Sequence, residues 1–207
     1  MSRSVHQNAK GELLAAVGEL CRSKDICVIG IDGLGGAGKS TIAEELCRGL
    51  SEGGSSTVLL HIDDFINKRE VRYDPAYPEW QCYYELQWRY GYFRSVIERL
   101  LSGEPVDAEL YDKENDSYFT QSFSAAGRCV IIVEGVFLQR EELRGLFDLT
   151  VYIDVPEAVR LERVLHRDTY IGGEDSIRAK YENRYFPAER KYVSEYRPKQ
   201  SADLVIE

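Results

Sequence analysis

The sequence has no long apolar run. No stretch of its 207 residues approaches the about 18 consecutive apolar residues of a membrane-spanning helix. The opening segment, MSRSVHQNAKGELLAAVGELCRS, also lacks the charged part, apolar part and cleavage site that make up a signal peptide. We therefore expect a cytoplasmic protein with no membrane partner.

Paired cysteines and clustered histidines are missing too. The five cysteines are scattered along the chain, and no two of them have CxxC spacing. The three histidines show no spacing typical of metal ligands. The composition argues against a disulfide framework, and free thiols are typical of a reducing cytosol.

Positive charge is in deficit. The chain has 26 Lys and Arg against 35 Asp and Glu, a formal net charge of −9. This balance argues against nucleic acid as the main partner, because a nucleic acid is itself strongly negative. It does not exclude a small phosphate ligand, since a local basic cluster can bind one in an acidic protein.

Short β-branched runs alternate with helix-like segments. We expect strands over residues 26–32, 57–63, 128–135, 148–155 and 202–207. We expect helices over residues 1–24, 40–50, 79–101, 156–168 and 176–195, the first with Leu13, Leu14, Val17 and Leu20 on one face. Apolar strands alternating with helices indicate a mostly parallel sheet covered on both faces. The prediction is a single three-layer α/β domain over residues 1–207.

A glycine-rich loop follows the first strand and precedes a helix. It fits the pattern G-x-x-x-x-G-K-[ST], which identifies a phosphate-binding loop and a P-loop NTPase fold. Its glycines let backbone N–H groups surround phosphate oxygens, and the helix that follows points its partial positive end at them. The lysine reaches the β and γ phosphates, and the serine can bind Mg²⁺. The predicted nucleotide-binding residues are Gly33, Leu34, Gly35, Gly36, Ala37, Gly38, Lys39, Ser40 and Thr41.

Two familiar classes of nucleotide-binding protein fit poorly. A switch GTPase needs a guanine-reading Asn-Lys-x-Asp, and the nearest match, NKRE at residues 67–70, ends in Glu. A transporter ATPase needs an LSGGQ signature, of which LSGE at residues 101–104 is only a fragment. Neither class is favoured.

Carboxylates follow the second and third expected strands. Asp63 and Asp64 come after the strand at 57–63, and Glu134 ends the strand at 128–135. Because α/β sheets bind ligands at the carboxyl ends of their strands, these acids should emerge near the γ-phosphate. A carboxylate there can accept a proton from a hydroxyl that attacks phosphorus. Glu134 could hold Mg²⁺ directly or through water.

The sequence resembles the uridine kinase/phosphoribulokinase family of P-loop kinases, which includes nicotinamide riboside kinases and bacterial pantothenate kinase. The resemblance runs from about Ile26 to Glu207. It is carried by GLGGAGKST, IDDF, YDPAYPEW, LYDKENDS, VIIVEGVFL, FDLTVYIDV, RLERVLHRD and ADLVIE, in this order.

The resemblance assigns roles around ATP and Mg²⁺. It implies that Asp63 is the catalytic base and that Asp63 and Glu134 hold Mg²⁺ beside Ser40. It implies that Arg163 and Arg167, in a helical lid over about residues 160–185, cover the phosphates together with Lys39. A guanidinium suits this role because charge builds up on the phosphoryl oxygens during transfer. The alternative for these arginines is a solvated helix face paired with Glu162 and Asp168.

The resemblance also implies a substrate-binding insertion over about residues 64–125. A nucleoside-binding aspartate and tyrosine of the family fall on Asp74 and Tyr111, where they could contact ribose and ring. Asp64 and Phe65 of the DDF motif and Tyr77 complete the candidate substrate-binding residues. The resemblance leaves a homo-oligomer open.

Two departures from the family bear on the acceptor. The family's pyrimidine-reading histidine falls on Asp116 or a neighbour, and no histidine lies nearby. The lid segment TYIGGED contains no arginine, and Arg178, Lys180 or Arg184 could compensate. The first departure argues against uridine itself, and the DDF spelling leans towards nicotinamide riboside kinases.

The segment from Tyr77 to Phe93 is unusually aromatic. Trp80, Tyr84 and Trp88 recur at every fourth position, which on a helix is one stripe. The stripe could pack on the core or on another subunit, or rings near Tyr77 and Trp80 could line the acceptor pocket. Stacking on single-stranded nucleic acid is disfavoured, because few basic residues are interleaved.

The sequence thus predicts a kinase that transfers the γ-phosphate of Mg·ATP to a hydroxyl of a small metabolite. A nucleoside 5′-hydroxyl is the favoured acceptor, with nicotinamide riboside and pantothenate as other acceptors. The alternative from another class is a nucleotide-binding regulator or ATPase without acceptor phosphorylation, which the arginine-poor lid segment would favour.

Overall fold

The central element of the fold is a five-stranded parallel sheet. The computed structural model describes residues 2–207, and their side chains from residue 11 onward; Met1 and the side chain of His6 lie outside the described part. The sheet has the order β2-β5-β1-β6-β7, and each neighbouring pair is parallel. Its strands are β1 (Ile26–Gly33), β2 (Ser56–His61), β5 (Cys129–Gly135), β6 (Leu149–Ile153) and β7 (Leu204–Ile206).

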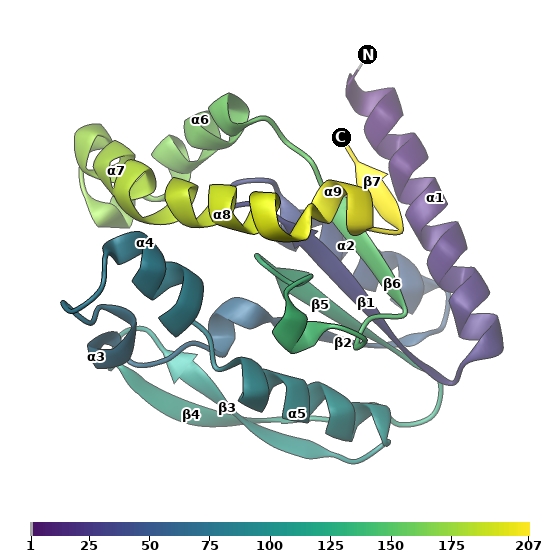
Figure 1. The fold of residues 1–207 in the computed structure, drawn as a ribbon. Coiled ribbons are helices and arrows are strands. Elements are labelled where there is room, and N and C mark those ends of the chain that lie inside the picture. Colours follow the sequence, from purple (N-terminus) through teal and green to yellow (C-terminus); the bar gives the residue numbers. More distant parts are fainter. Residues whose placement is uncertain (1) are drawn as a thin grey trace.

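Helices cover both faces of this sheet (Figure 1). Leu13 and Val17 of α1 (Ser2–Ser23) and Leu46 of α2 (Lys39–Glu52) pack on one face, as the apolar face of the first helix predicts. Helices α5 (Tyr90–Leu101) and α8 (Phe186–Tyr196) pack on the other, through residues such as Phe93 and Tyr192. The expected three-layer α/β fold with a parallel sheet is confirmed.

The aromatic helix expected over residues 79–101 is interrupted, so that prediction was wrong. The structure has α4 (Glu79–Gln81), a π-helical turn (Cys82–Leu86) and, after a break, α5. Trp88 lies in the break, bridged to Ile66, and the backbone N–H of Arg89 donates to the carbonyl of Phe65 at 2.9 Å. The adjacent segment at residues 65–67 thus forms the hydrogen bonds that a continuous helix would have formed within itself. Trp80 and Trp88 therefore do not share one regular helical stripe.

An antiparallel hairpin was not anticipated. It consists of β3 (Val106–Asp112) and β4 (Ser117–Phe123), and α5 packs beside it (Figure 1). Buried Val106, Ala108 and Leu110 alternate with exposed Asp107 and Glu109, which is the pattern of a strand with one buried face. The signal was present in the sequence, but it spans few residues. A short helix, α3 (Arg69–Arg72), also forms in the stretch expected to be irregular.

The C-terminal part is helical. Helix α6 (Glu157–Arg167) begins after Pro156, as the sequence predicts, and a 3-10 turn (Thr169–Ile171) follows. Helix α7 (Glu174–Lys180) continues through a π-helical turn (Tyr181–Tyr185) into α8, and α9 (Pro198–Ser201) precedes β7. Among the described residues, none of the helices is both long and apolar enough to cross a membrane.

The turn after β2 lies directly against the end of β5. The 3-10 turn Ile62–Asp64 carries Asp63, and Ile62 approaches Gly135 so closely that a Cβ on this glycine would lie 2.2 Å from Ile62 Cγ2. Any larger residue at position 135 would push this turn away from β5. The missing side chain of Gly135 therefore determines how near Asp63 lies to Glu134.

We predict that Gly135→Ala destabilises the protein by about 1–3 kcal/mol, because a buried contact becomes overpacked. Gly91→Ala is the matched control, since a Cβ at this exposed position of α5 meets nothing within 4 Å. The free energy of unfolding of the control should rise by about 0.5–1 kcal/mol, because alanine has a higher helix propensity than glycine. Urea unfolding followed by circular dichroism measures both. Equal midpoints for Gly135→Ala and the wild type would contradict the close contact.

Candidate active site

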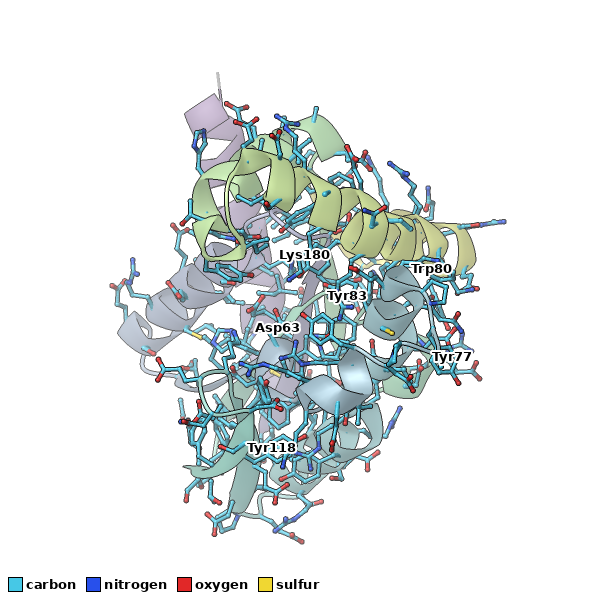
Figure 2. All side chains as sticks on the ribbon, turned by 90° about the vertical axis from the view of Figure 1, so that its left-hand side faces the viewer. Asp63, Tyr77, Trp80, Tyr83, Tyr118 and Lys180 are labelled. Carbon is cyan, nitrogen blue, oxygen red and sulfur yellow. The ribbon has the colours of Figure 1, made fainter. Side chains whose placement is uncertain are left out.

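A cavity of about 560 Å³ opens at the carboxyl ends of β1, β2 and β5 (Figure 2). Its floor is the phosphate-binding loop, with Gly35, Gly36, Lys39 and Ser40, and the ends of β2 and β5 contribute Asp63, Glu134 and Val136. The insertion wall, from residues 64–125, comprises Ile66, Arg69, Arg72, Tyr73, Tyr83, Gln87 and Lys113. The lid wall, from the C-terminal helices, comprises Arg167, Asp168, Tyr170, Lys180, Tyr181, Tyr185 and Glu189.

The loop between β1 and α2 has the conformation that its glycines permit. Gly36 and Gly38 have φ of 80° and 96°, in the left-handed region that favours glycine. A Cβ on Gly36 would also lie 2.9 Å from the carbonyl oxygen of Arg160. Helix α2 begins at Lys39, so the N–H groups of its first turn have no partners within the helix and can bind an anion.

A buried ion pair holds the loop from behind. The guanidinium of Arg160, on α6, donates to Glu189 Oε2 at 2.8 Å and to the carbonyl oxygen of Gly35 at 2.9 Å. The N–H of Gly35 donates to Glu189 Oε1 at 2.8 Å. Both side chains are 3% exposed. This pair could not be predicted from the sequence, because nothing in the motif indicates which helices pack against the loop.

Lys39 lies between the loop and the acidic strand ends. It is 9% exposed, and its Nζ donates to the carbonyl oxygen of Leu34 at 3.1 Å. Burial lowers the pKa of Lys39 below its ordinary value, while the nearby carboxylates of Glu134 and Asp63 act in the opposite direction. The site thus brings Lys39 close to both predicted acids.

Glu134 is bound by two side chains. Ser40 Oγ donates to Glu134 Oε1 at 3.2 Å, and His61 Nδ1 lies 2.6 Å from the same oxygen. Burial raises the pKa of Glu134, but the His61 hydrogen bond and the charge of Lys39 outweigh it and hold that pKa below its ordinary value. The hydrogen bond to Glu134 also raises the pKa of His61. Glu134 is therefore ionised at neutral pH.

The fit of this arrangement to Mg²⁺ can be judged from its donors. Among the described residues, no group of three or more His, Cys, Asp and Glu side chains is placed to hold a metal ion. Mg²⁺ characteristically takes one or two protein groups and completes its shell with phosphate oxygens and water. Ser40 and Glu134, in contact beside the loop, fit such a partial set of ligands.

Of the DDF residues, Asp63 alone lines the cavity. The carboxylate of Asp63 is exposed, and Oδ1 accepts a hydrogen bond from the Trp88 indole at 3.3 Å. Asp64 lies outside the lining, and burial raises its pKa. Phe65 is 1% exposed and packs on Phe93, with ring centroids 4.6 Å apart. Phe65 is thus a core residue, contrary to its expected place beside a substrate.

The two lid arginines lie in different surroundings. Arg167 lines the cavity, and its Nε donates to Asp168 Oδ1 at 2.6 Å. The Tyr181 hydroxyl donates to the other oxygen of this carboxylate, Oδ2, at 2.6 Å. Arg163 was expected over the phosphates, but it donates at 3.3 Å to the carbonyl oxygens of Gly36 and Ala37 and is not part of the lining. The structure therefore places Arg163 against the loop backbone.

The expected acceptor residues lie outside the cavity lining. Asp74 caps the backbone N–H of Ala76 at 2.9 Å, and Tyr77 is 45% exposed. Tyr111 is buried behind the insertion wall, where its hydroxyl accepts from Arg72 at 2.8 Å and donates to Asp116 at 2.6 Å. Gly33, Leu34, Ala37, Gly38 and Thr41 belong to the loop segment without lining this cavity.

The aromatic segment and the suggested lid cations each contribute to the cavity lining, but Tyr77 and Trp80, the rings suggested for the acceptor pocket, do not line it. Figure 2 shows Asp63, Tyr83 and Lys180 near the centre of this face, with Tyr77 and Trp80 toward its edge. Tyr83 comes from the aromatic segment, and Lys180 is the one of three suggested lid cations that lines the cavity. Arg72 and Gln87 belong to no motif, so their place in the cavity could not be predicted from the sequence.

Comparisons with known proteins agree with this geometry. The chain matches the phosphoribulokinase / uridine kinase family over residues 28–207. It is similar to a uridine kinase of Leuconostoc citreum, with 33% identity over 68% of each chain. It is also similar to a uridine kinase of Lactiplantibacillus plantarum, with 29% identity over 86% of this chain and 85% of the relative.

A solved structure is similar throughout. It is described as a possible uridine kinase from Bacillus stearothermophilus and shares 32% identity with this chain, with a TM-score of 0.75. The match covers 95% of this chain and all of the other. Together with the phosphate-binding loop and the acids around it, these matches show that the chain belongs to the phosphoribulokinase / uridine kinase family.

Proposed function

We propose that this protein transfers the γ-phosphate of Mg·ATP to the 5′-hydroxyl of a nucleoside-like small molecule. As a member of its family, the chain is a kinase that acts on a hydroxyl group. One observation carries the proposal. Lys39, Ser40, Glu134 and Asp63 face a single cavity that extends from the phosphate-binding loop to the insertion wall, which leaves room for two substrates.

Asp63 is the proposed base. The acceptor oxygen attacks the γ-phosphorus, an O–P bond forms, and the bond to the bridging oxygen breaks with its electron pair on ADP. The acceptor proton passes to Asp63. The exposure of this carboxylate to the cavity and its hydrogen bond from Trp88 support the assignment, since the indole holds one oxygen and leaves the other free.

The remaining donor groups bind phosphate charge. The loop N–H groups and Lys39 would hold the phosphates, with Arg167 facing them from the lid wall. Ser40 and Glu134 would hold Mg²⁺, which when bound neutralises phosphate charge. The contacts of Arg163 with loop carbonyls support a role in shaping the loop, in place of direct phosphate contact.

The insertion wall is the proposed acceptor site. The names of the relatives support a nucleoside, and the rings of Tyr73, Tyr83 and Tyr185 on the cavity surface suit a flat or ring-shaped ligand. Tyr111 would act through Arg72, to which it is hydrogen-bonded. A direct role for Asp74 or Tyr77 remains a prediction. Free cysteines support a cytoplasmic location.

We predict that Asp63→Asn lowers kcat by about 10²–10⁴-fold, because the amide cannot accept the acceptor proton. ATP affinity, measured by calorimetry, should change little. Asp64→Asn is the neighbouring control, expected to stay within about tenfold of the wild type because Asp64 does not line the cavity. Near-normal turnover by Asp63→Asn would remove Asp63 as the base.

Release of ADP that depends on an added acceptor tests whether the protein is a kinase. Purified protein with Mg·ATP should release ADP faster when a nucleoside is added than in an acceptor-free blank, because water is a poorly positioned acceptor. The panel includes uridine, nicotinamide riboside, pantothenate, glycerate and sugars, with phosphorylated product identified by mass spectrometry. ADP release that no member of the panel increases would favour an ATPase or a nucleotide-binding regulator.

A further inference from the structure

Arg184 is a buried arginine without an anionic partner. The side chain is 1% exposed and lies beneath the insertion wall. It donates to three neutral oxygens: Oε1 of Gln87 at 3.0 Å, and the carbonyl oxygens of Arg72 and Glu79 at 3.1 Å each. Within the part of the chain that the structure describes, no carboxylate forms an ion pair with it. The guanidinium charge therefore has no carboxylate partner among these residues, and its Cζ lies over the Tyr73 ring, 4.3 Å from the ring centroid.

Arg72 adds a second buried charge at the same place. It is 9% exposed and lines the cavity. Its hydrogen-bond partners are the neutral hydroxyls of Tyr111 at 2.8 Å and Tyr73 at 3.5 Å, and its buried Nε–H has no partner. By contrast, the buried guanidinium behind the phosphate-binding loop, Arg160, is paired with Glu189.

Two lysines extend this positive region across the cavity. Lys113 lies on the insertion wall, and Lys180 lies on the lid wall with its Nζ 5.9 Å from the centre of the Tyr73 ring. Neither forms an ion pair with a carboxylate of the described residues. Asp64 interacts with Lys113 only at longer range, and Asp116 is already bound by the Tyr111 hydroxyl. The cations Arg69, Arg72, Lys113 and Lys180 thus line this side of the cavity. Of the four carboxylates in the lining, Glu134, Asp168 and Glu189 are bound by other side chains, and Asp63 faces the cavity.

Gln87 presents a further donor. A guanidinium only donates hydrogen bonds, so the amide atom that faces Arg184 must be the oxygen. The amide nitrogen is thereby turned away from Arg184, and the residue lines the cavity. This wall thus combines fixed donors and positive charge.

We propose that the acceptor of this kinase carries an anionic oxygen group, a carboxylate or a phosphate, which binds between Arg72, Lys113 and Lys180. The proposal rests on the proposed function, since it concerns the second substrate of that reaction. Burying unpaired guanidinium groups is costly, and an anion that accepts charge-assisted hydrogen bonds offsets that cost. Arg184 supports the site from beneath, through Gln87 and the backbone of Arg72.

The test compares acceptors that share a hydroxyl but differ in charge. The pairs are nicotinamide riboside with nicotinic acid riboside, and uridine with its 6-carboxy derivative, for a carboxylate. Ribulose with ribulose 5-phosphate tests a phosphate. We expect the acidic member of at least one pair to have the higher kcat/KM, by about tenfold or more. A preference within a nucleoside pair would indicate a carboxylate, and a preference within the ribulose pair would indicate a phosphate.

Substitutions of Lys113 and Lys180 test whether these residues cause the preference for an acidic acceptor. Lys113→Met and Lys180→Met should each raise the KM of the acidic acceptor by about tenfold, with the KM for ATP and the KM of the neutral partner little changed. Lys191→Met is the matched control, because Lys191 lies on the same helical segment as Lys180 and pairs with Glu195 at the surface. A raised KM for ATP with an intact acid preference would assign Lys180 to the donor and overturn its role here.

The outcomes separate this inference from the proposed function. Neutral acceptors that react as well as their acidic partners would overturn the anionic site and leave the kinase assignment standing. If no acceptor is phosphorylated, the anionic site is tested by binding instead. The Mg·ADP-saturated protein is titrated with the same pairs of compounds in a calorimeter. Tighter binding of an acidic member, lost in Lys113→Met and Lys180→Met, would still support the anionic site. Equal binding of both members would overturn it.

Discussion

The register of three parallel strands is the constraint from which the site follows. His61 at the end of β2 lies beside Glu134 of β5, and Asp32 of β1 lies beside Gly135. Because the strands run in parallel and end at one level, the phosphate-binding loop, the Asp63 turn and Glu134 emerge together. Gly135 has no side chain, so the turn at Ile62 comes close enough to bring Asp63 to the same cavity.

Charge is arranged differently on the two sides of this cavity. Beside the loop, two buried cations have opposite charges near them: Arg160 pairs with Glu189, and Lys39 lies near Glu134. Such pairs hold the loop in one geometry. On the insertion wall, Arg72 and Arg184 meet neutral oxygens. This positive charge on the insertion wall is the basis of the proposed anionic acceptor group.

The donor half of the site could be predicted because its parts are local in sequence. Each of its parts belongs to a short motif or to the end of a predicted strand. The cavity lining includes residues of the phosphate-binding loop, the acids Asp63 and Glu134 at the strand ends, and Arg167. The acceptor half could not be predicted in the same way. Its residues come from a broken helix, a short helix and the lid. The helix breaks because the N–H of Arg89 donates to the carbonyl of Phe65, and the carbonyl of Gln87 accepts from the N–H of Asn67. Such long-range competition leaves no periodic signal.

The sequence by itself determined the fold class, the phosphate-binding loop and the order of acids behind it, because hydrophobic periodicity and glycine requirements act over a few residues. The tertiary structure decided which side chains face the cavity. It placed Phe65 in the core, Arg163 against the loop backbone and Tyr111 behind Arg72. The physical reason is that facing a cavity depends on packing between elements far apart in the chain. The same packing left Arg184 buried with no carboxylate partner among the described residues.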